Sequence, residues 1–587
     1  MTRKRTAGAV AAAATLTLAL AACGGGSSTS GSGSTGSGSS AKPAFNAAVS
    51  ANYNPSSSKG GVLRMANESD WDLLDPANNY YSYEWNFNRL YTRTLVTFAA
   101  EPGEASGKLV PDLAQSLGVP SDGAKTWTYK LKPGLKYEDG TAITAKDIKY
   151  DVERSLDKTT FPNGPTYFND FLVGAANYSP YKDKSAEGLK SIETPDDSTI
   201  IFHLNKPFSG FDYFAQIPST APVPQAKDTG AKYKQHVISS GPYKFSVNNA
   251  GKNFTLVRNT NWDPSTDPNR KALPDEIDVA LNVNADDIDQ RLLSGDLDVA
   301  VTGVGVGSAV QGQVLGNPQQ KQYADAAAST RLWFTSINGN VKPFDNVHCR
   351  RAVEYAADRT GYQTAFGGPI AGGDIATNML PPTIPGQETF NTYPVSANTG
   401  DVAKAKQELA ECGQPNGFST SYSYRAERPH EKAAAEALQQ SLHKAGIELT
   451  LKSFPQADYF AQYAGKPDYP QKNGLGLMAN GWASDWPDGY GFLAQLVDSR
   501  VIRATGGSSN FSVRDPAVDS LLDSALNQTD TAAREKIWVS IDKKVMDDAY
   551  ILPGVWTHTL LYRPKNLTNV FVSNAYSMYD YASLGVK

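Results

Sequence analysis

A tract of glycine, serine and threonine at residues 24–40 sets the first limit on the fold, because it offers no side chain for a hydrophobic core. The chain stays polar, with scattered proline and serine, as far as about Gly60. We therefore expect a flexible tether over residues 23–60, with an end-to-end distance of about 30 Å. About 527 residues remain for a folded body that begins near Gly61, and this is more than one small domain holds.

The chain begins with an apolar segment between basic residues and a cysteine. Three basic residues at 3–5 precede the apolar residues 9–22, which are fewer than the roughly 20 that span a bilayer. The sequence LAAC at 20–23 resembles a bacterial lipobox, in which cleavage leaves the cysteine as a lipidated N-terminus. We expect a signal peptide over 1–22 and a lipid anchor on Cys23 at the outer face of the bacterial cell membrane. The alternative is an ordinary secretory signal with an incidental cysteine.

Composition narrows the classes of partner and cofactor. Hydrophobic residues make up 40% of the chain and aromatic residues 10%, which is enough for a sizeable core. The net charge of −5 argues against nucleic acid as a partner, since its phosphates require a basic surface. Three cysteines are too few for a cysteine-rich zinc module, and none of the six histidines forms an H-E-x-x-H motif. We expect no metal site and no cofactor.

Strand-like and helix-like segments alternate along the body and predict an α/β fold. Strands are indicated where β-branched and aromatic residues lie between turn residues, at 62–66, 126–131, 199–204 and 241–245. Helices are indicated by apolar periodicity at 145–156, 350–358, 401–411, 431–444, 515–527 and 532–546. Thr144 and Asp147 have the spacing of a capping box at the start of the first helix.

A set of short motifs follows in order along the body. They are VPDLAQSL at 110–117, WTYKLKPG at 127–134, YEDGTAITAKDI at 137–148, SGPY at 240–243, Arg258-Asn259 with Trp262, LSGDLD at 293–298, PFD at 343–345, RAV at 351–353, AADR at 356–359 and GWASDWPD at 481–488. Together they resemble the family 5 extracellular solute-binding proteins, the peptide/nickel-type receptors of ABC importers. Each motif alone is weak evidence, whereas the ordered set is specific.

The resemblance implies a two-lobed, periplasmic-binding-protein-like α/β fold that closes on its ligand about a hinge. The expected divisions are lobe I at 61–88, 211–320 and 556–587, a subdomain inserted in lobe I at 89–210, and lobe II at 321–555.

The resemblance also implies ligand-binding residues in the segment 481–488. In the dipeptide and oligopeptide branches, an aspartate of this segment binds the α-amino group of the peptide, and its position here is that of Asp485. Trp482 is the expected aromatic wall beside the ligand. The alternative for Asp485 is a turn or helix-cap residue, because the sequence Asp-Trp-Pro-Asp favours turns; that role is expected of Asp488.

A ligand carboxylate requires a cation, and arginine suits it because its planar guanidinium binds both oxygens. Arg425 resembles by position the carboxylate-binding arginine of the dipeptide branch, and Arg428 is close enough to substitute. A solvated loop cation is the alternative. Further candidates at the cleft are the aromatic residues Tyr83, Trp85 and Trp333, each of which could instead pack in the core.

The two remaining cysteines, Cys349 and Cys412, lie at the start of one predicted helix and the end of another. Thiols outside the cytoplasm tend to oxidise, so we expect a disulfide between them. Two isolated buried cysteines are the alternative.

The resemblance implies a monomeric, extracytoplasmic substrate-binding component that captures peptides and delivers them to an ABC permease in the membrane. No set of nucleophile, base and orienting residue indicates an enzyme. The alternatives are a receptor for a nickel chelate or an oligosaccharide, a surface peptide-sensing protein, and an extracellular hydrolase.

Overall fold

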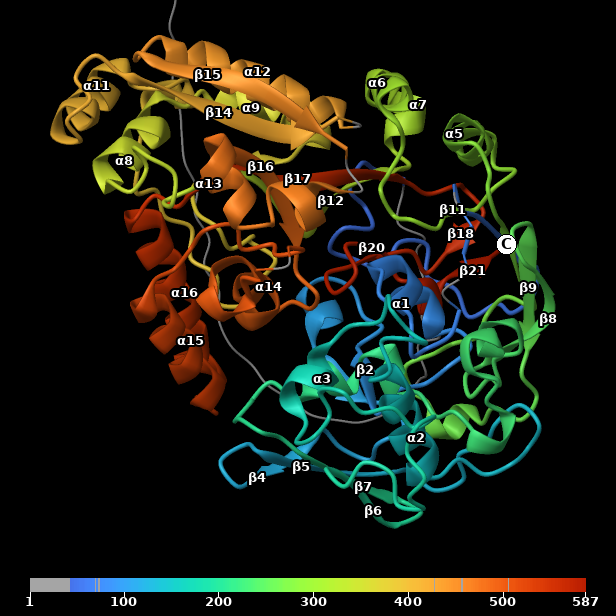
Figure 1. The fold of residues 1–587 in the computed structure, drawn as a ribbon. Coiled ribbons are helices and arrows are strands. Elements are labelled where there is room, and N and C mark those ends of the chain that lie inside the picture. The colour runs from blue at the N-terminus through green and yellow to red at the C-terminus, as the bar shows by residue number, and fades with distance from the viewer. Residues whose placement is uncertain (1–42, 69, 72–73, 427, 456–457, 505) are drawn as a thin grey trace, which may run out of the picture. The chain divides into compact units, whose positions relative to one another are not determined.

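The computed structural model describes residues 43–587 apart from 69, 72–73, 427, 456–457 and 505. Its order of elements is mixed α/β, as the sequence predicts (Figure 1). The expected signal peptide, Cys23 and the first part of the expected tether lie outside the described residues. None of the helices in the described part has both the length and the apolar character needed to cross a membrane.

A five-stranded sheet has the order β11-β1-β10-β9-β8. Its strands are β1 (Val62–Ala66), β8 (Tyr243–Asn249), β9 (Asn253–Arg258), β10 (Glu276–Ala280) and β11 (Val299–Ala300). β1 is parallel to both neighbours, whereas β8, β9 and β10 pair in antiparallel fashion. β1 is therefore flanked by two strands, β10 and β11, that lie more than 200 residues later in the sequence.

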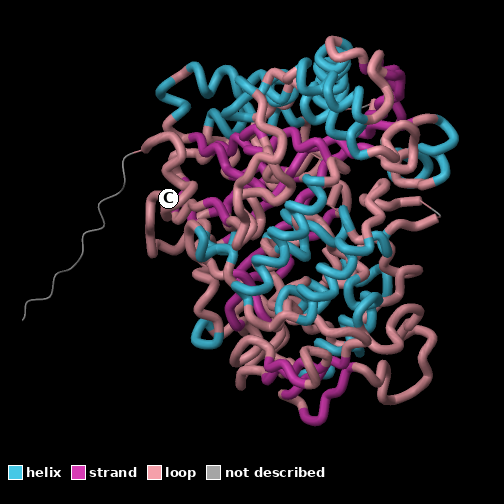
Figure 2. Tube along the Cα trace, turned by 90° about the vertical axis from the view of Figure 1, so that its left-hand side faces the viewer, coloured by secondary structure: helices cyan, strands magenta, loops and turns pink. Residues whose placement is uncertain are grey.

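A six-stranded sheet has the order β13-β17-β12-β16-β14-β15. Its strands are β12 (Ala324–Ile337), β13 (Asp374–Ile375), β14 (Phe418–Arg425), β15 (Ile447–Phe454), β16 (Leu475–Ala483) and β17 (Ile551–Tyr562). Helix α12 (Pro429–His443) contacts β14 and β15, and Figure 2 shows helices next to strands in the upper part of the molecule. The antiparallel pair β12 and β17 is long enough to contribute to two cores. Ala324 packs with Leu292 and Leu560 in one of them. Leu332 lies in the other, beneath α14 (Gly489–Val497) and α16 (Thr531–Asp547).

A third, antiparallel sheet has the order β4-β5-β7-β6. Its strands are β4 (Val119–Ser121), β5 (Thr126–Lys130), β6 (Ile192–Asp196) and β7 (Thr199–His203). Short two-stranded pairs are formed by β2 (Val96–Phe98) with β3 (Leu109–Pro111), β18 (Leu567–Thr568) with β21 (Gly585–Val586), and β19 (Val572–Ser573) with β20 (Met578–Tyr579).

The remaining α-helices are α1 (Ser82–Asn88), α2 (Ala145–Ser155), α3 (Tyr167–Phe171), α4 (Asp212–Ala215), α5 (Ala285–Ser294), α6 (Ser308–Gly316), α7 (Pro318–Lys321), α8 (Val347–Ala356), α9 (Arg359–Ala365), α10 (Gly368–Ala371), α11 (Val402–Glu411), α13 (Asp468–Asn473) and α15 (Pro516–Asn527). The predicted capping box of α2 is confirmed, since Asp147 accepts a hydrogen bond from the backbone N–H of Thr144 at 2.7 Å. That reciprocal pairing satisfies N–H groups that the first helical turn leaves without partners.

Residues 43–60 differ from the expected tether. Ala48 is fully buried and its N–H donates to Asp325 at 3.0 Å. Tyr53 forms an isolated antiparallel bridge with Val570, and Arg563 donates to the carbonyl group of Ala44. The expectation that the packed body begins near Gly61 is therefore wrong. The few apolar residues of this segment were enough for packing, since Ala48 and Tyr53 are buried in the core and Phe45 packs against a second apolar cluster.

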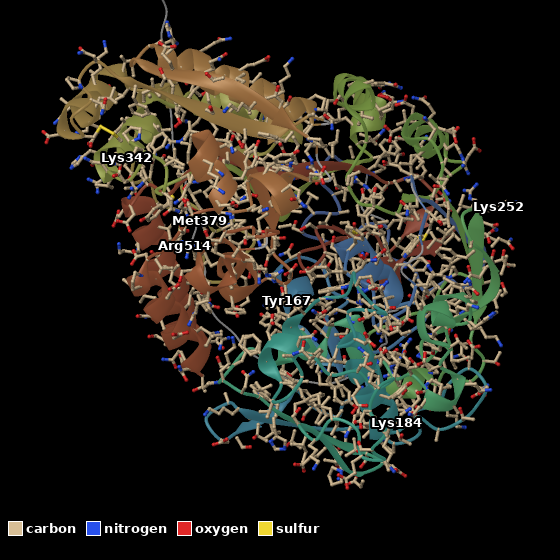
Figure 3. All side chains as sticks on the ribbon, in the orientation of Figure 1. Tyr167, Lys184, Lys252, Lys342, Met379 and Arg514 are labelled. Atoms are coloured by element: carbon tan, nitrogen blue, oxygen red, sulfur yellow. A yellow bond between two sulfur atoms is a disulfide. The ribbon has the colours of Figure 1, made fainter. Side chains whose placement is uncertain are left out.

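Cys349 and Cys412 form a disulfide, with Cα atoms 5.4 Å apart. The bond joins the first turn of α8 to the residue that ends α11, and it is the yellow bond in Figure 3. It fastens two helices that pack together on the outer side of the six-stranded sheet's core.

Candidate functional site

The segment 481–488 begins in the last three residues of β16, where this strand pairs with β12, and continues beyond the strand. In this register Arg331 lies opposite Ala483 and Trp333 lies opposite Gly481. A Cβ atom on Gly481 would come within 2.1 Å of Cε3 of Trp333, so the indole lies across the glycine backbone. Only glycine permits this close approach of the indole to the strand backbone.

A cavity of about 380 Å³ opens at this strand end. Aromatic side chains form much of its lining, namely those of Tyr80, Tyr81, Trp85, Phe98, Phe460, Trp482 and Tyr576. Three charged side chains line it as well, namely Asp485, Arg331 and Arg425. Aromatic walls with a few polar groups are typical of ligand pockets, and the volume lies near the lower end of their range.

Larger cavities lie elsewhere in the described part of the chain. One of about 660 Å³ lies beside α2 and β6, and its lining includes lysine and acidic side chains. Another of about 740 Å³ lies beside Tyr213, Pro487 and Arg534. Neither is lined by a residue that the sequence analysis assigned to the ligand, so we take the smaller cavity as the candidate site.

Asp485 accepts hydrogen bonds on Oδ2 from two tyrosine hydroxyl groups. Tyr80 donates over 3.2 Å. Tyr167, the first residue of α3 and labelled in Figure 3, also donates to it. Burial raises the pKa of Asp485 to about 6, although both tyrosine hydrogen bonds act in the opposite direction. No lysine, arginine or histidine of the described residues forms an ion pair with it. A partly buried carboxylate thus faces a cavity without a countercharge.

Trp482 and Asp488 lie on either side of Asp485 in the sequence and have different roles. Trp482 lines the cavity and packs against the core beneath α14 and α16. Asp488 is the N-cap of α14, because its side chain accepts a hydrogen bond from the N–H of Tyr490 at 2.8 Å. It is therefore bound to the backbone, which agrees with the structural role expected for it.

Arg425, the last residue of β14, lines the cavity, but its guanidinium binds Glu431 of α12. Nε of Arg425 donates to Oε1 and Oε2 of Glu431 over 2.8 and 3.1 Å, and Nη2 donates to Oε1 as well. Both side chains are buried, with Glu431 only 2% exposed. The charge of Arg425 is therefore neutralised within the protein, and its assignment to a ligand carboxylate stays a prediction.

The other predicted residues divide between the cavity and its surroundings. Trp85 lines the cavity, and its indole N–H donates to the carbonyl group of Asn79 at 3.1 Å. Tyr83 instead stacks on Tyr81, and Trp333 stacks on Phe366. Arg428 lies over the ring of Trp333, with its guanidinium carbon 5.5 Å from the ring centroid. These last three residues support the wall rather than line the cavity.

Arg331 lines the cavity and was not among the predicted residues. It lies on β12 two positions before Trp333, and its guanidinium carbon lies 5.3 Å from that ring's centroid. The available signal was the pattern Arg-x-Trp in a strand, which places both side chains on one face. Without the strand register, nothing in the sequence paired that face with Gly481 and Ala483.

No group of three or more histidine, cysteine, aspartate or glutamate side chains in the described part of the chain is arranged to hold a metal ion.

Comparison with known proteins places this geometry in a family. Residues 108–503 match the model of the bacterial extracellular solute-binding proteins, family 5. The chain is 27% identical over 500 residues to the probable D,D-dipeptide-binding periplasmic protein DdpA of Escherichia coli K12, covering 83% of this chain and 87% of that one. It is 25% identical over 472 residues to the glutathione-binding protein GsiB of the same strain, covering 79% and 84%.

A solved structure described as clavulanic acid biosynthesis oligopeptide binding protein 2 superimposes with a TM-score of 0.89 at 40% identity, covering 93% of this chain and 98% of that one. The predicted two-lobed fold and the predicted family are therefore confirmed. The chain belongs to the bacterial extracellular solute-binding proteins of family 5.

Proposed function

We propose that this protein is the extracytoplasmic substrate-binding component of an ABC importer and that its ligands are short peptides. It captures a peptide in the cavity at the end of β16, closes about a hinge and delivers the peptide to a membrane permease. Similar proteins support this class of ligand, since they are named for binding a D,D-dipeptide, glutathione or oligopeptides. The divisions into lobes I and II and an inserted subdomain belong to this proposal, with residues 43–60 added to lobe I because they contact its C-terminal piece.

The observation that carries the proposal is the carboxylate of Asp485 at an aromatic cavity. A peptide's α-ammonium group supplies the positive charge and the hydrogen-bond donors that this carboxylate lacks. The aromatic side chains offer apolar area without selecting one particular side chain, which suits a receptor for many peptides. The similar proteins are named as binding proteins, which supports binding of the ligand without its conversion.

The order of features at the N-terminus supports a lipid anchor on Cys23 as part of the proposal. Several acyl chains on one cysteine hold a protein at a membrane firmly. The mass of the mature protein and its partition into the membrane fraction test this, with Cys23→Ser as the comparison. A mature chain that keeps residues 1–22, or one of unlipidated mass, contradicts the anchor.

Native mass spectrometry of the purified protein, followed by identification of any ligand released from it, tests the function. We expect peptides with free amino groups. A released nickel chelate or oligosaccharide would contradict the peptide assignment, and turnover of peptides or glycosides would indicate a hydrolase. Deletion of the gene should abolish uptake of the identified peptide, whereas intact uptake would indicate a sensor.

A further inference from the structure

The charged groups at the cavity are not equivalent, because one of its arginines already has a partner. Nε and Nη2 of Arg425 bind the carboxylate of Glu431, which is almost fully buried. This ion pair joins the end of β14 to the first turn of α12. Arg425 therefore has the surroundings of a structural residue, although it lies at the cavity.

Arg331 has a different environment. No carboxylate of the described residues forms an ion pair with its guanidinium, which lies against Trp333 and faces the cavity. The guanidinium carbons of Arg425 and Arg428 lie 5.7 and 5.5 Å from the same ring's centroid. Burial and repulsion by Arg428 and Arg425 lower the pKa of Arg331 to about 10. Three guanidinium groups thus converge on one indole.

Among the described residues that line this cavity, the two charges without a countercharge have opposite signs. Asp485 lies two residues beyond Ala483, and Ala483 is the cross-strand neighbour of Arg331. Their side chains line the same space, and aromatic rings enclose it. An occupant that carries one cationic and one anionic group would satisfy both, whereas a neutral sugar would leave both charges partly desolvated and unpaired.

We propose that Arg331, rather than Arg425, binds a carboxylate group of the ligand, and that the cavity selects short zwitterionic peptides held between Asp485 and Arg331. This inference rests on the proposed function and adds to it the residue that sets the charge of the ligand. A guanidinium binds both oxygens of a carboxylate through parallel hydrogen bonds. The carboxylate comes either from the peptide's C-terminus or from an acidic side chain.

Binding of synthetic peptide pools tests the inference. Four pools of tripeptides serve as probes: free peptides, their C-terminal amides, amides with a glutamate side chain, and N-acetylated peptides. Hits found by native mass spectrometry are measured by isothermal titration calorimetry on the full mature chain. The variants are Arg331→Gln and Arg331→Lys, with Arg514→Gln as the matched control, because Arg514 is exposed and lies away from the cavity (Figure 3).

We expect Arg331→Gln to weaken the binding of free tripeptides by about 10- to 100-fold, the range typical of the loss of a hydrogen bond to a charged group. C-terminal amidation should weaken binding to the unmodified protein by a similar factor, and the two changes together should cost little more than either alone. Arg331→Lys should recover part of the affinity. If the glutamate-containing amides rather than the free acids respond to Arg331→Gln, the side-chain carboxylate is the group bound, and the inference holds.

Equal affinity of Arg331→Gln and the unmodified protein for free tripeptides would overturn the inference while leaving the proposed function intact. Equal losses for free acids and neutral amides would also overturn it, since they would indicate a structural role. If the unmodified protein binds no pool, the proposed function fails and the inference fails with it. The melting temperature of each variant reports folding, and Arg331→Lys allows the amide comparison should Arg331→Gln not fold.

Discussion

The hydroxyl group of Tyr80 donates a hydrogen bond to Oδ2 of Asp485 over 3.2 Å, although the two residues lie 405 positions apart in the chain. Tyr167 donates to the same oxygen atom. Both tyrosines belong to the part of the chain before β8, whereas Asp485 follows β16. The carboxylate proposed to bind a peptide's ammonium group therefore already accepts hydrogen bonds from two neutral hydroxyl groups. A ligand must bind it more favourably than these two hydrogen bonds alone.

Replacing Asp485 by asparagine should weaken the binding of peptides with a free amino group about 10- to 100-fold. The amide keeps the size of the side chain and an oxygen atom for Tyr80 and Tyr167, but it loses the charge that attracts an ammonium group. N-acetylated peptides should be affected far less, and calorimetric titration of matched peptide pairs measures the difference. Asp286→Asn, an exposed change on α5, serves as the control. Equal losses for both kinds of peptide would contradict the amino-group assignment.

Binding of free-amine peptides should weaken at acid pH, with a midpoint that follows the pKa of Asp485. Because burial raises that pKa to about 6, the carboxyl group becomes neutral as pH falls below this value. We expect about tenfold lower affinity at about pH 5 than at about pH 7. The Asp485→Asn variant should show a flat profile across this range. An equally steep profile in that variant would assign the pH dependence to another group.

The stability of the ligand-free protein should fall as pH rises, whereas the affinity for free-amine peptides should rise. The unfolded carboxyl group loses its proton near its ordinary pKa of 3.8, whereas folded Asp485 keeps its proton up to about pH 6. The folded state therefore binds more protons between these values, and stability falls as pH rises through them. Asp542 has a buried carboxyl group whose pKa is also raised to about 6. The contribution of Asp485 is therefore isolated by comparing the pH dependence of the unfolding free energy between the unmodified protein and the Asp485→Asn variant.

The capping box at Thr144 and the strand at Val62–Ala66 could be predicted because they depend on neighbouring residues and on turn punctuation. The position of Asp485 and Trp482 at one cavity could be predicted through a family motif that is continuous in the sequence, and their binding of a ligand stays a prediction. The pairing of Arg425 with Glu431 and the position of Arg331 at the cavity could not be predicted, because they depend on how the strands and α12 pack. Glu431 reaches Arg425 only after α12 folds back on β14, and Arg331 joins the cavity only through the register of β12 with β16.

Removing the charge of Arg425 should destabilise the protein more than it affects peptide recognition. Arg425→Gln leaves the buried Glu431 with the more distant cation Arg428, whose Nε lies 4.0 Å from Oε1, and losing the close ion pair costs up to about 3–5 kcal/mol. The double variant Arg425→Gln with Glu431→Gln should recover much of the loss. Urea unfolding measures both. A single variant as stable as the unmodified protein would remove the structural assignment and return Arg425 to the list of ligand-binding residues.

Gly481→Ala should displace Trp333 and lower peptide affinity together with stability. The added methyl group would come within 2.1 Å of the indole, and overpacking of this kind costs about 1–3 kcal/mol. Gly312→Ala is the matched control, because a Cβ atom there meets no atom within 4 Å and the position lies in α6. It should be neutral or stabilise by up to about 1 kcal/mol. Tryptophan fluorescence and thermal unfolding report the two effects, and an unchanged Gly481→Ala variant would contradict the close packing.

The disulfide between Cys349 and Cys412 should contribute stability without contributing to recognition. It closes a loop across a sequence separation of 63 residues, for which the chain-entropy model gives about 4 kcal/mol. The double variant Cys349→Ala with Cys412→Ala should unfold at lower urea concentration and bind peptides with unchanged affinity, because both helices lie outside the cavity lining. Mass measurement after alkylation, with and without reductant, checks the bond itself. Two alkylated thiols in the unreduced protein would show that it is absent, and a changed peptide affinity in the double variant would show that α8 and α11 influence the site.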